Sequence, residues 1–217
     1  LVDVPENQIP PALTDAFRQA NQEYQTSLRI NADFPSGRMR MAVDQHRRGN
    51  LERAAEEYLA VLKIDNGYNG ARMNLAQLYY SQGKLSATEN LYRTVTEKEP
   101  EASEAHYSLG LLMAEQGDYE QAARSLEAAA TTGNNPRAWY NLAVLHQQSG
   151  KSLEAEKAYL AALQLIPNNP EFINGLVSLY GQQQRWYKAM QLIDRALVSD
   201  PTNPSLQQLK RAITQRL

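Results

Sequence analysis

The sequence has no cysteine among its 217 residues. Disulfide bonds, thiolate zinc sites, a cysteine nucleophile and C-x-x-C-H haem attachment are therefore excluded within it. No apolar run approaches the about 18 residues that a transmembrane helix needs, so we expect no membrane insertion. The formal net charge of −2 provides no basic excess for phosphate contacts, so we expect no nucleic acid among the partners.

Catalytic motifs are also missing. The sequence contains no glycine-rich phosphate loop, no G-x-S-x-G elbow and no H-E-x-x-H motif. Its three histidines, His46, His106 and His146, lie in different segments, and no carboxylate spacing completes a metal-ligand set. His106 and His146 are interpreted as core or groove residues. We predict no catalytic, cofactor-binding or metal-binding residues, and no enzymatic activity.

A short pattern recurs about every 34 residues: a small residue followed four positions later by a large one. The copies are Ala20/Tyr24, Ala54/Tyr58, Thr88/Tyr92, Ala122/Leu126, Ala155/Tyr159 and Ala189/Ile193. A period of this length is typical of solenoid proteins, in which each unit buries its apolar face against its neighbours.

The clearest copy reads Trp139-x-x-Leu142-Ala143-x-x-His146, then Gly150, Ala155-x-x-x-Tyr159, Ala162 and Pro167. This pattern resembles the tetratricopeptide repeat (TPR), a pair of antiparallel helices. Ala143 and Ala155 are small where the two helix axes approach to roughly 8–10 Å. Gly150 suits a left-handed cap after the first helix, and Pro167 cannot continue the second. The resemblance implies an all-α fold, a right-handed α-solenoid of helix-turn-helix repeats.

The repeat register divides the chain into segments. We predict an extended segment (1–12), a half-repeat helix (13–34), five full repeats (35–68, 69–102, 103–135, 136–169 and 170–203) and a C-terminal capping helix (204–217). The half-repeat copies a second repeat helix without its first helix. Together with a start at Leu1 rather than Met, it leads us to expect a fragment of a longer protein.

A narrower resemblance rests on Glu23-Tyr24, the run Leu28-Arg29-Ile30-Asn31-Ala32-Asp33-Phe34-Pro35, and Asn74-Leu75-Ala76-x-Leu78-Tyr79. This combination is similar to the C-terminal TPR module of bacterial multihaem c-type cytochrome family proteins. The similarity runs through most of residues 10–217. It implies export to the periplasm, with any haem held by an upstream domain and none in this chain.

In TPR arrays, the first helix of each repeat lines a concave groove. The resemblance therefore implies a partner-binding groove that combines apolar and tyrosine area with amides for a peptide backbone. Its residues would be Met73, Asn74, Gln77, Tyr80, Tyr107, Leu111, Tyr140, Asn141 and Val144. The alternative is that these side chains pack against neighbouring helices.

A basic cluster marks the first repeat and forms a possible second surface for an acidic partner. It consists of Arg38, Arg40, Arg47 and Arg48, with Arg53 nearby. The alternative is an ordinary solvated helix face.

These observations predict a non-catalytic protein–protein interaction scaffold that binds a protein or peptide. The specific version is a module of an exported, periplasmic multihaem cytochrome. Two alternatives stay open: a free-standing TPR adaptor, in the cytoplasm or the periplasm, and a regulatory or accessory domain of an enzyme encoded upstream in the same chain.

Overall fold

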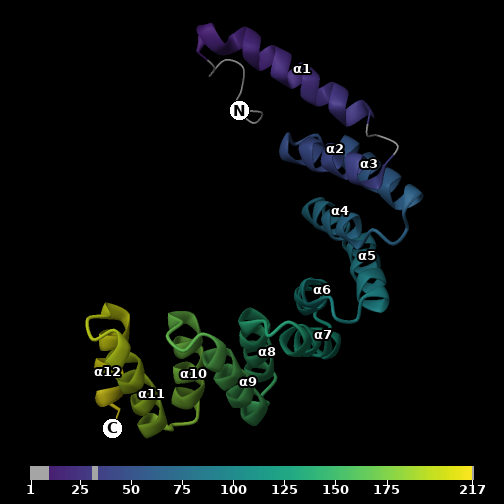
Figure 1. Cartoon of the computed structure of the whole chain (residues 1–217). Helices are drawn as coiled ribbons and strands as arrows, with labels where there is room; N and C mark the ends of the chain where they lie inside the picture. The colour runs from purple at the N-terminus through teal and green to yellow at the C-terminus, as the bar shows by residue number, and fades with distance from the viewer. Residues whose placement is uncertain (1–9, 31–33, 217) are drawn as a thin grey trace. The chain divides into compact units, whose positions relative to one another are not determined.

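The computed structural model describes residues 10–30 and 34–216. Within them the chain forms one 3-10 turn, Pro11–Leu13, and twelve α-helices, with no β-strand (Figure 1). The helices are α1 (Thr14–Ile30), α2 (Pro35–Arg47), α3 (Leu51–Ile64), α4 (Asn69–Ser81), α5 (Leu85–Lys98), α6 (Ser103–Glu115), α7 (Tyr119–Thr132), α8 (Pro136–Gln148), α9 (Ser152–Leu165), α10 (Pro170–Gln182), α11 (Trp186–Ser199) and α12 (Pro204–Thr214). The predicted all-α class is confirmed, and a helix pair lies within each of the five predicted repeats.

The structure describes only part of the predicted extended N-terminal segment. Residues 1–9 lie outside the described part of the chain, as do residues 31–33 at the end of the predicted half-repeat. Pro11 and Ala12, which we predicted as extended, form a 3-10 turn with Leu13, whose amide donates to the Pro10 carbonyl at 2.8 Å. Proline tolerates this first-turn position, since its missing N–H would have no helical partner there.

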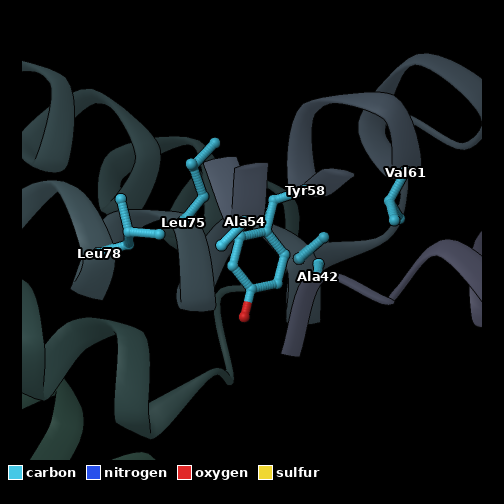
Figure 2. Close-up of a cluster of buried hydrophobic side chains, with 7 residues drawn as sticks. Ala42, Ala54, Tyr58, Val61, Leu75 and Leu78 are labelled. Atoms are coloured by element: carbon cyan, nitrogen blue, oxygen red, sulfur yellow. The ribbon is translucent and has the colours of Figure 1, made fainter. Parts of the chain in front are cut away.

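Two compact units make up the chain, residues 1–91 and residues 92–217, with the boundary inside α5. In the first unit, α2 packs on α3, and α3 packs on α4. Tyr58 is buried at the centre of this unit with Ala42, Ala54, Val61 and Leu75 (Figure 2). Small residues at positions 42 and 54 let α2 and α3 approach closely enough to enclose the Tyr58 ring.

In the second unit, α6 packs on α7, α8 on α9, α10 on α11, and α12 covers α11. Gly110 lies where the first helix of its repeat meets the second. A Cβ atom there would meet Leu126 Cγ at 2.8 Å, so the smallest residue is required. At the end of the unit, α12 buries Leu206 and Ile213 and exposes its polar side, as expected for a capping helix.

Three helices of the second unit begin in the same way. Asn135, Asn169 and Asn203 cap α8, α10 and α12, each accepting a hydrogen bond from a backbone amide of the first turn. A proline follows each asparagine at the first helical position, where its fixed φ suits the helix. These Asn-Pro pairs set where each helix begins, and therefore which of its residues face outward.

The turn between the helices of a repeat needs a left-handed residue. Gly49, Gly83, Gly117 and Gly150 take φ between +70° and +81°, which glycine adopts without strain. In the last repeat Gln184 takes φ +57° at the same position. The substitution does not interrupt the repeat, because α11 still begins two residues later at Trp186.

Candidate binding surface on the first helices

The predicted groove residues lie on three first helices, α4 in the first unit and α6 and α8 in the second, and we call each unit's set its first-helix wall. In the first unit, α4 carries Met73 and Asn74, which are half-buried, and Gln77 and Tyr80, which are exposed. The spacing of these four residues places them on one side of α4. The first unit therefore has a wall of mixed apolar and amide character.

In the second unit the predicted groove residues lie on α6 and α8. Leu111 on α6 has 41% of its surface exposed. Tyr107 on α6 and Tyr140, Asn141 and Val144 on α8 are half-buried. Among the predicted wall residues of this unit, Leu111 is therefore the most exposed apolar side chain.

A hydrogen bond joins the two helices of this second wall. Asn141 Nδ2 donates to Tyr107 Oη at 3.0 Å, across 34 residues of sequence. The bond holds the Tyr107 ring in place and uses one amide hydrogen of Asn141. The second amide hydrogen and the carbonyl oxygen of Asn141 are still able to pair with a peptide backbone.

The sixth residue of a first helix, counted from the first residue of the helix, has a structural role that recurs in two repeats. Asn74 hydrogen-bonds the Tyr58 hydroxyl, and Ser108 hydrogen-bonds the Tyr92 hydroxyl, each from the following repeat. Burial raises the pKa of both tyrosines, and these hydrogen bonds oppose the rise. The sixth position therefore contacts the second helix of the preceding repeat as well as the wall.

Tyr140 is a packing residue as much as a wall residue. Its ring stacks on Phe172 with centroids 5.1 Å apart, and it meets Tyr159 at 5.8 Å in a tilted arrangement. Burial, followed by the charge of Glu171, raises the pKa of Tyr140. The packing alternative stated for the wall therefore describes Tyr140, which joins α8 to α9 and α10.

Gln147 also lies on the wall side of α8, although it is not among the predicted groove residues. The Tyr159 hydroxyl donates to Gln147 Oε1 at 2.8 Å, and Gln147 Nε2 donates to Gln182 Oε1 at 2.9 Å. These bonds link α9, α8 and α10 through uncharged groups. The sequence signal was the position of Gln147 on the wall side of α8, one helical turn beyond Val144.

A pocket of about 300 Å³ lies between α10 and α12. It is lined by Asn174, Ser205, Gln208, Leu209 and Ala212. Asn174 occupies the same repeat position as Tyr107 and Tyr140. The lining mixes polar and apolar side chains and carries no charge, like the wall on α8.

The predicted basic patch is partly neutralised by its own carboxylates. Arg38 pairs with Glu57 at 2.8 Å, and Arg48 pairs with the buried Asp44 at 2.9 Å. Arg40 and Arg47 are exposed. Two of the four predicted arginines therefore stabilise the first repeat, which reduces the positive charge offered to an acidic partner.

The histidines lie apart and have no metal-like surroundings. His46 Nδ1 lies 3.4 Å from the Tyr58 hydroxyl, and His106 Nε2 lies 3.0 Å from the Pro100 carbonyl oxygen. His106 and His146 are half-buried rather than buried in the core, and burial lowers the pKa of His146. No group of three His, Asp or Glu side chains in the described part of the chain could hold a metal ion.

The structure reveals an ionic cluster between the last two repeats that the sequence did not indicate. Arg185 pairs with both carboxylate oxygens of Glu156 at 2.5 and 3.0 Å, Lys188 Nζ lies 3.3 Å away, and the Tyr180 hydroxyl donates at 2.9 Å. Hydrogen bonding from Arg185 is the main reason that the pKa of Glu156 falls from 4.5 to about 2. Burial raises the pKa of Tyr180 to about 12, and the hydrogen bond to the Glu156 carboxylate adds to this rise.

This cluster predicts acid sensitivity of the last repeats. Because the unfolded chain protonates Glu156 near 4.5 and the folded chain only near 2, the unfolded state binds more protons between these values. The stability from Glu156 is complete above pH 4.5 and is lost as pH falls towards 2. Urea midpoints at pH 6 and pH 3 should therefore differ more for the wild type than for Glu156→Gln. Exposed Glu154 on the same helix supplies the control, and an unchanged difference in Glu156→Gln would contradict the prediction.

The helix pairs define the chain as an all-helical repeat protein, and family comparison gives the family. One tetratricopeptide repeat model matches residues 73–135 and 114–170, and a second matches residues 150–213. These matches span well over half of the chain, so it belongs to the tetratricopeptide repeat family. No curated protein sequence matches it.

Solved structures share this fold at low sequence identity. A crystal structure of MamA has a TM-score of 0.67 at 18% identity, covering 77% of this chain and 92% of that chain. PilF from Pseudomonas aeruginosa has a TM-score of 0.65 at 21% identity, covering 86% of this chain and 85% of that chain. YrrB has a TM-score of 0.65 at 17% identity, covering 87% of this chain and 97% of that chain. At these identities the likeness establishes the fold alone. Within the described residues, no helix is long and apolar enough to cross a lipid bilayer.

Proposed function

We propose that the chain is a non-catalytic interaction scaffold that binds a peptide or protein segment on the first-helix wall of its second unit. The observation that carries the proposal is the wall of the second unit. There, Leu111 is exposed on α6 beside Tyr107, whose hydroxyl is fixed by Asn141 of α8. An exposed apolar side chain next to an oriented hydroxyl and an amide offers burial for a side chain and hydrogen bonds for a backbone.

The proposed ligand is an extended, largely uncharged segment. The wall on α8 consists of Tyr140, Asn141, Val144 and Gln147, none of which is charged, and the pocket between α10 and α12 is also uncharged. A strongly charged ligand would lose its hydration here without gaining an opposite charge. YrrB, a protein of similar fold, is described as a TPR protein with an unusual peptide-binding site, which supports peptide binding as the mode.

A matched pair of substitutions tests the wall. Peptides selected from a random library against the full chain should lose at least about tenfold in affinity to Leu111→Glu, because a central contact residue typically carries more than 1 kcal/mol. Leu160→Glu is the control, since Leu160 has nearly the same exposure, 42% against 41%, but lies on the second helix α9. Fluorescence anisotropy measures binding, and circular dichroism confirms that both variants keep their helicity.

The outcomes separate the wall from the other surfaces. If Leu160→Glu abolishes binding and Leu111→Glu does not, the second helices bind the ligand. If replacing the exposed Arg40 and Arg47 by Gln abolishes binding instead, recognition runs through the basic patch. Either result would overturn the proposal. We expect the arginine changes to act weakly and mainly at low salt.

A finer proposal concerns the larger protein. We propose that this scaffold is a module of an exported bacterial multihaem cytochrome and is periplasmic, with no cofactor of its own. Its support is the sequence of residues 23–35 and 74–79. The matched family models are those of the repeat, and the three similar structures described above are not named as haem proteins.

The reading frame upstream of Leu1 tests this finer proposal, because haem-attachment motifs behind a signal peptide would support it. An initiator Met directly before Leu1 would overturn it in favour of a free-standing adaptor. A catalytic domain in place of the haem motifs would indicate an enzyme accessory domain.

A further inference from the structure

Along the second unit, the wall side of the first helices changes from aromatic to carboxamide. The fifth and ninth residues of a first helix are about one turn apart and share this side. Helix α12 continues the series, since its fifth residue, Gln208, lies 34 residues after Asn174 of α10. The pairs of fifth and ninth residues are Tyr107/Leu111 on α6, Tyr140/Val144 on α8, Asn174/Ser178 on α10 and Gln208/Ala212 on α12. Beyond α8, an amide with a small residue therefore replaces tyrosine with an aliphatic residue.

This change coincides with a hollow in the surface. The pocket of about 300 Å³ between α10 and α12 is lined by both amides of the series, Asn174 and Gln208, and by Ser205, Leu209 and Ala212. The two amides and Ser205 are exposed, and Leu209 is half-buried. Helices α8, α10 and α12 follow one another along the second unit (Figure 1). The pocket therefore comes next after the wall on α8, on the same side of the first helices.

The polar side chains of this pocket are not used inside the fold. In the described part of the chain, the side chains of Asn174, Ser205 and Gln208 form no hydrogen bond with another residue. On α8, by contrast, Asn141 and Gln147 are both hydrogen-bonded to side chains of neighbouring helices. Two carboxamides and a hydroxyl are thus available to a ligand at one place.

We propose that this pocket is a subsite for a carboxamide side chain, Gln or Asn, of the segment that binds the second-unit wall, and in this it rests on the proposed function. A carboxamide presents two N–H donors and a carbonyl acceptor. Asn174 and Gln208 offer the same groups in return, and the Ser205 hydroxyl both donates and accepts. Leu209 and Ala212 supply apolar area for the methylene groups of the incoming side chain.

A charged side chain fits this pocket less well. Its lining in the described part of the chain contains no Asp, Glu, Lys or Arg. Lys210 and Arg211 of α12 lie outside it, and Lys210 pairs with Asp194 of α11 at 2.6 Å. A carboxylate or an ammonium group would therefore lose hydration without gaining an opposite charge, whereas a carboxamide exchanges its water contacts for hydrogen bonds of the same kind.

The repeat register also indicates where the carboxamide falls in the ligand. From Leu111 on α6, the pocket between α10 and α12 lies two and a half helix spacings away, or roughly 20–25 Å at 8–10 Å per spacing. An extended chain advances about 3.3 Å per residue. The carboxamide residue should therefore lie about six to eight residues from the apolar residue that contacts Leu111.

Peptides selected from a random library against the full chain test the subsite. We expect them to carry Gln or Asn about six to eight residues from their main apolar residue. Replacing this Gln or Asn by the corresponding acid, or by an apolar residue of similar size, should weaken binding about fivefold or more, because hydrogen bonds to the pocket are lost. Fluorescence anisotropy measures the affinities.

A double-mutant cycle locates the contact. Gln208→Leu should weaken the parent peptide about fivefold and have little further effect on the peptide with the apolar replacement, since both changes remove the same hydrogen bonds. Gln164→Leu is the matched control and should leave binding unchanged. Gln164 is also exposed and forms no side-chain hydrogen bond in the described part of the chain, but it lies on the second helix α9. Circular dichroism confirms that both variants keep their helicity.

The outcomes distinguish this inference from the proposed function. If the peptides depend on Leu111 but show no preference for Gln or Asn, or if the two changes of the cycle simply add, the subsite is wrong and the wall stands. A preference for a charged residue at that place would also overturn the carboxamide assignment. If binding depends on Gln208 and the carboxamide but not on Leu111, the subsite stands and the apolar contact is wrongly placed. If no peptide binds, both are wrong.

Discussion

Replacing Tyr159 by alanine should lower the free energy of unfolding by about 3–5 kcal/mol, the cost typical of deleting a large buried aromatic side chain. Tyr159 on α9 is 1% exposed. Its ring meets Tyr140 of α8, and the space beside it is closed by Gly175 of α10. The substitution would therefore leave a cavity where three helices meet, which neighbouring side chains fill only in part. Urea unfolding followed by circular dichroism measures the loss.

Tyr159→Phe is the matched control because it keeps the ring and removes only the hydroxyl. That hydroxyl donates to Gln147 Oε1 at 2.8 Å, so its loss should cost about 1 kcal/mol. Burial raises the pKa of Tyr159, which keeps the hydroxyl protonated as a donor at neutral pH. If Tyr159→Ala cost no more than Tyr159→Phe, the ring would not be part of a packed core, and the assignment of Tyr140 to packing would also be wrong.

The helices were predictable because their signals are local and repeated. The small-then-large pair specifies where two helices touch, and the turn glycines specify where each first helix ends. Even Gln184, which departs from the glycine pattern, did not obscure the last repeat, since the neighbouring repeat supplied the register. Five copies of a degenerate motif carry more information than any single copy, because an error in one copy is corrected by the others.

The site was less predictable because side-chain contacts between repeats depend on particular pairs. The register placed Tyr140 and Asn141 on the wall side of α8. It could not show that Phe172 covers Tyr140, or that Tyr107 takes a hydrogen bond from Asn141. Such contacts join residues about one repeat apart, and no local pattern marks them. The cluster of Glu156 with Arg185 and Lys188 was missed for the same reason, since its members lie 29 and 32 residues apart.

The sixth position shows how one repeat position serves different contacts. Asn74 and Ser108 hydrogen-bond the tyrosine of the preceding repeat. Asn141 follows a repeat with Leu126 in place of that tyrosine, and its amide donates to Tyr107 instead. The fourth case, Gly175, has no side chain, although Tyr159 precedes it. The rings of Tyr159 and Tyr140 occupy the space that a side chain at position 175 would need, which explains this exception.

Gly175→Ala should lower the free energy of unfolding by about 1–3 kcal/mol through overpacking, although alanine favours a helix over glycine. A Cβ atom at this position would lie 2.5 Å from Tyr159 Cε1, 2.9 Å from Tyr159 Cζ and 3.1 Å from Tyr140 Cε2. Both rings are fixed by their neighbours, since Tyr140 stacks on Phe172 and Tyr159 is buried. The added methyl group would have to push an aromatic ring out of its packed position.

Gly70→Ala provides the comparison in the first unit. Gly70 also lies in a first helix, but its Cβ atom would meet Tyr68 only at an ordinary 3.5 Å. Helix propensity then acts alone, and the substitution should raise the free energy of unfolding by about 0.5–1 kcal/mol. The two substitutions should thus have opposite signs in urea unfolding. A stabilising Gly175→Ala would mean that the Tyr140 and Tyr159 rings move freely, and the sixth position of the last repeat would then be open to a ligand instead of filled by packing.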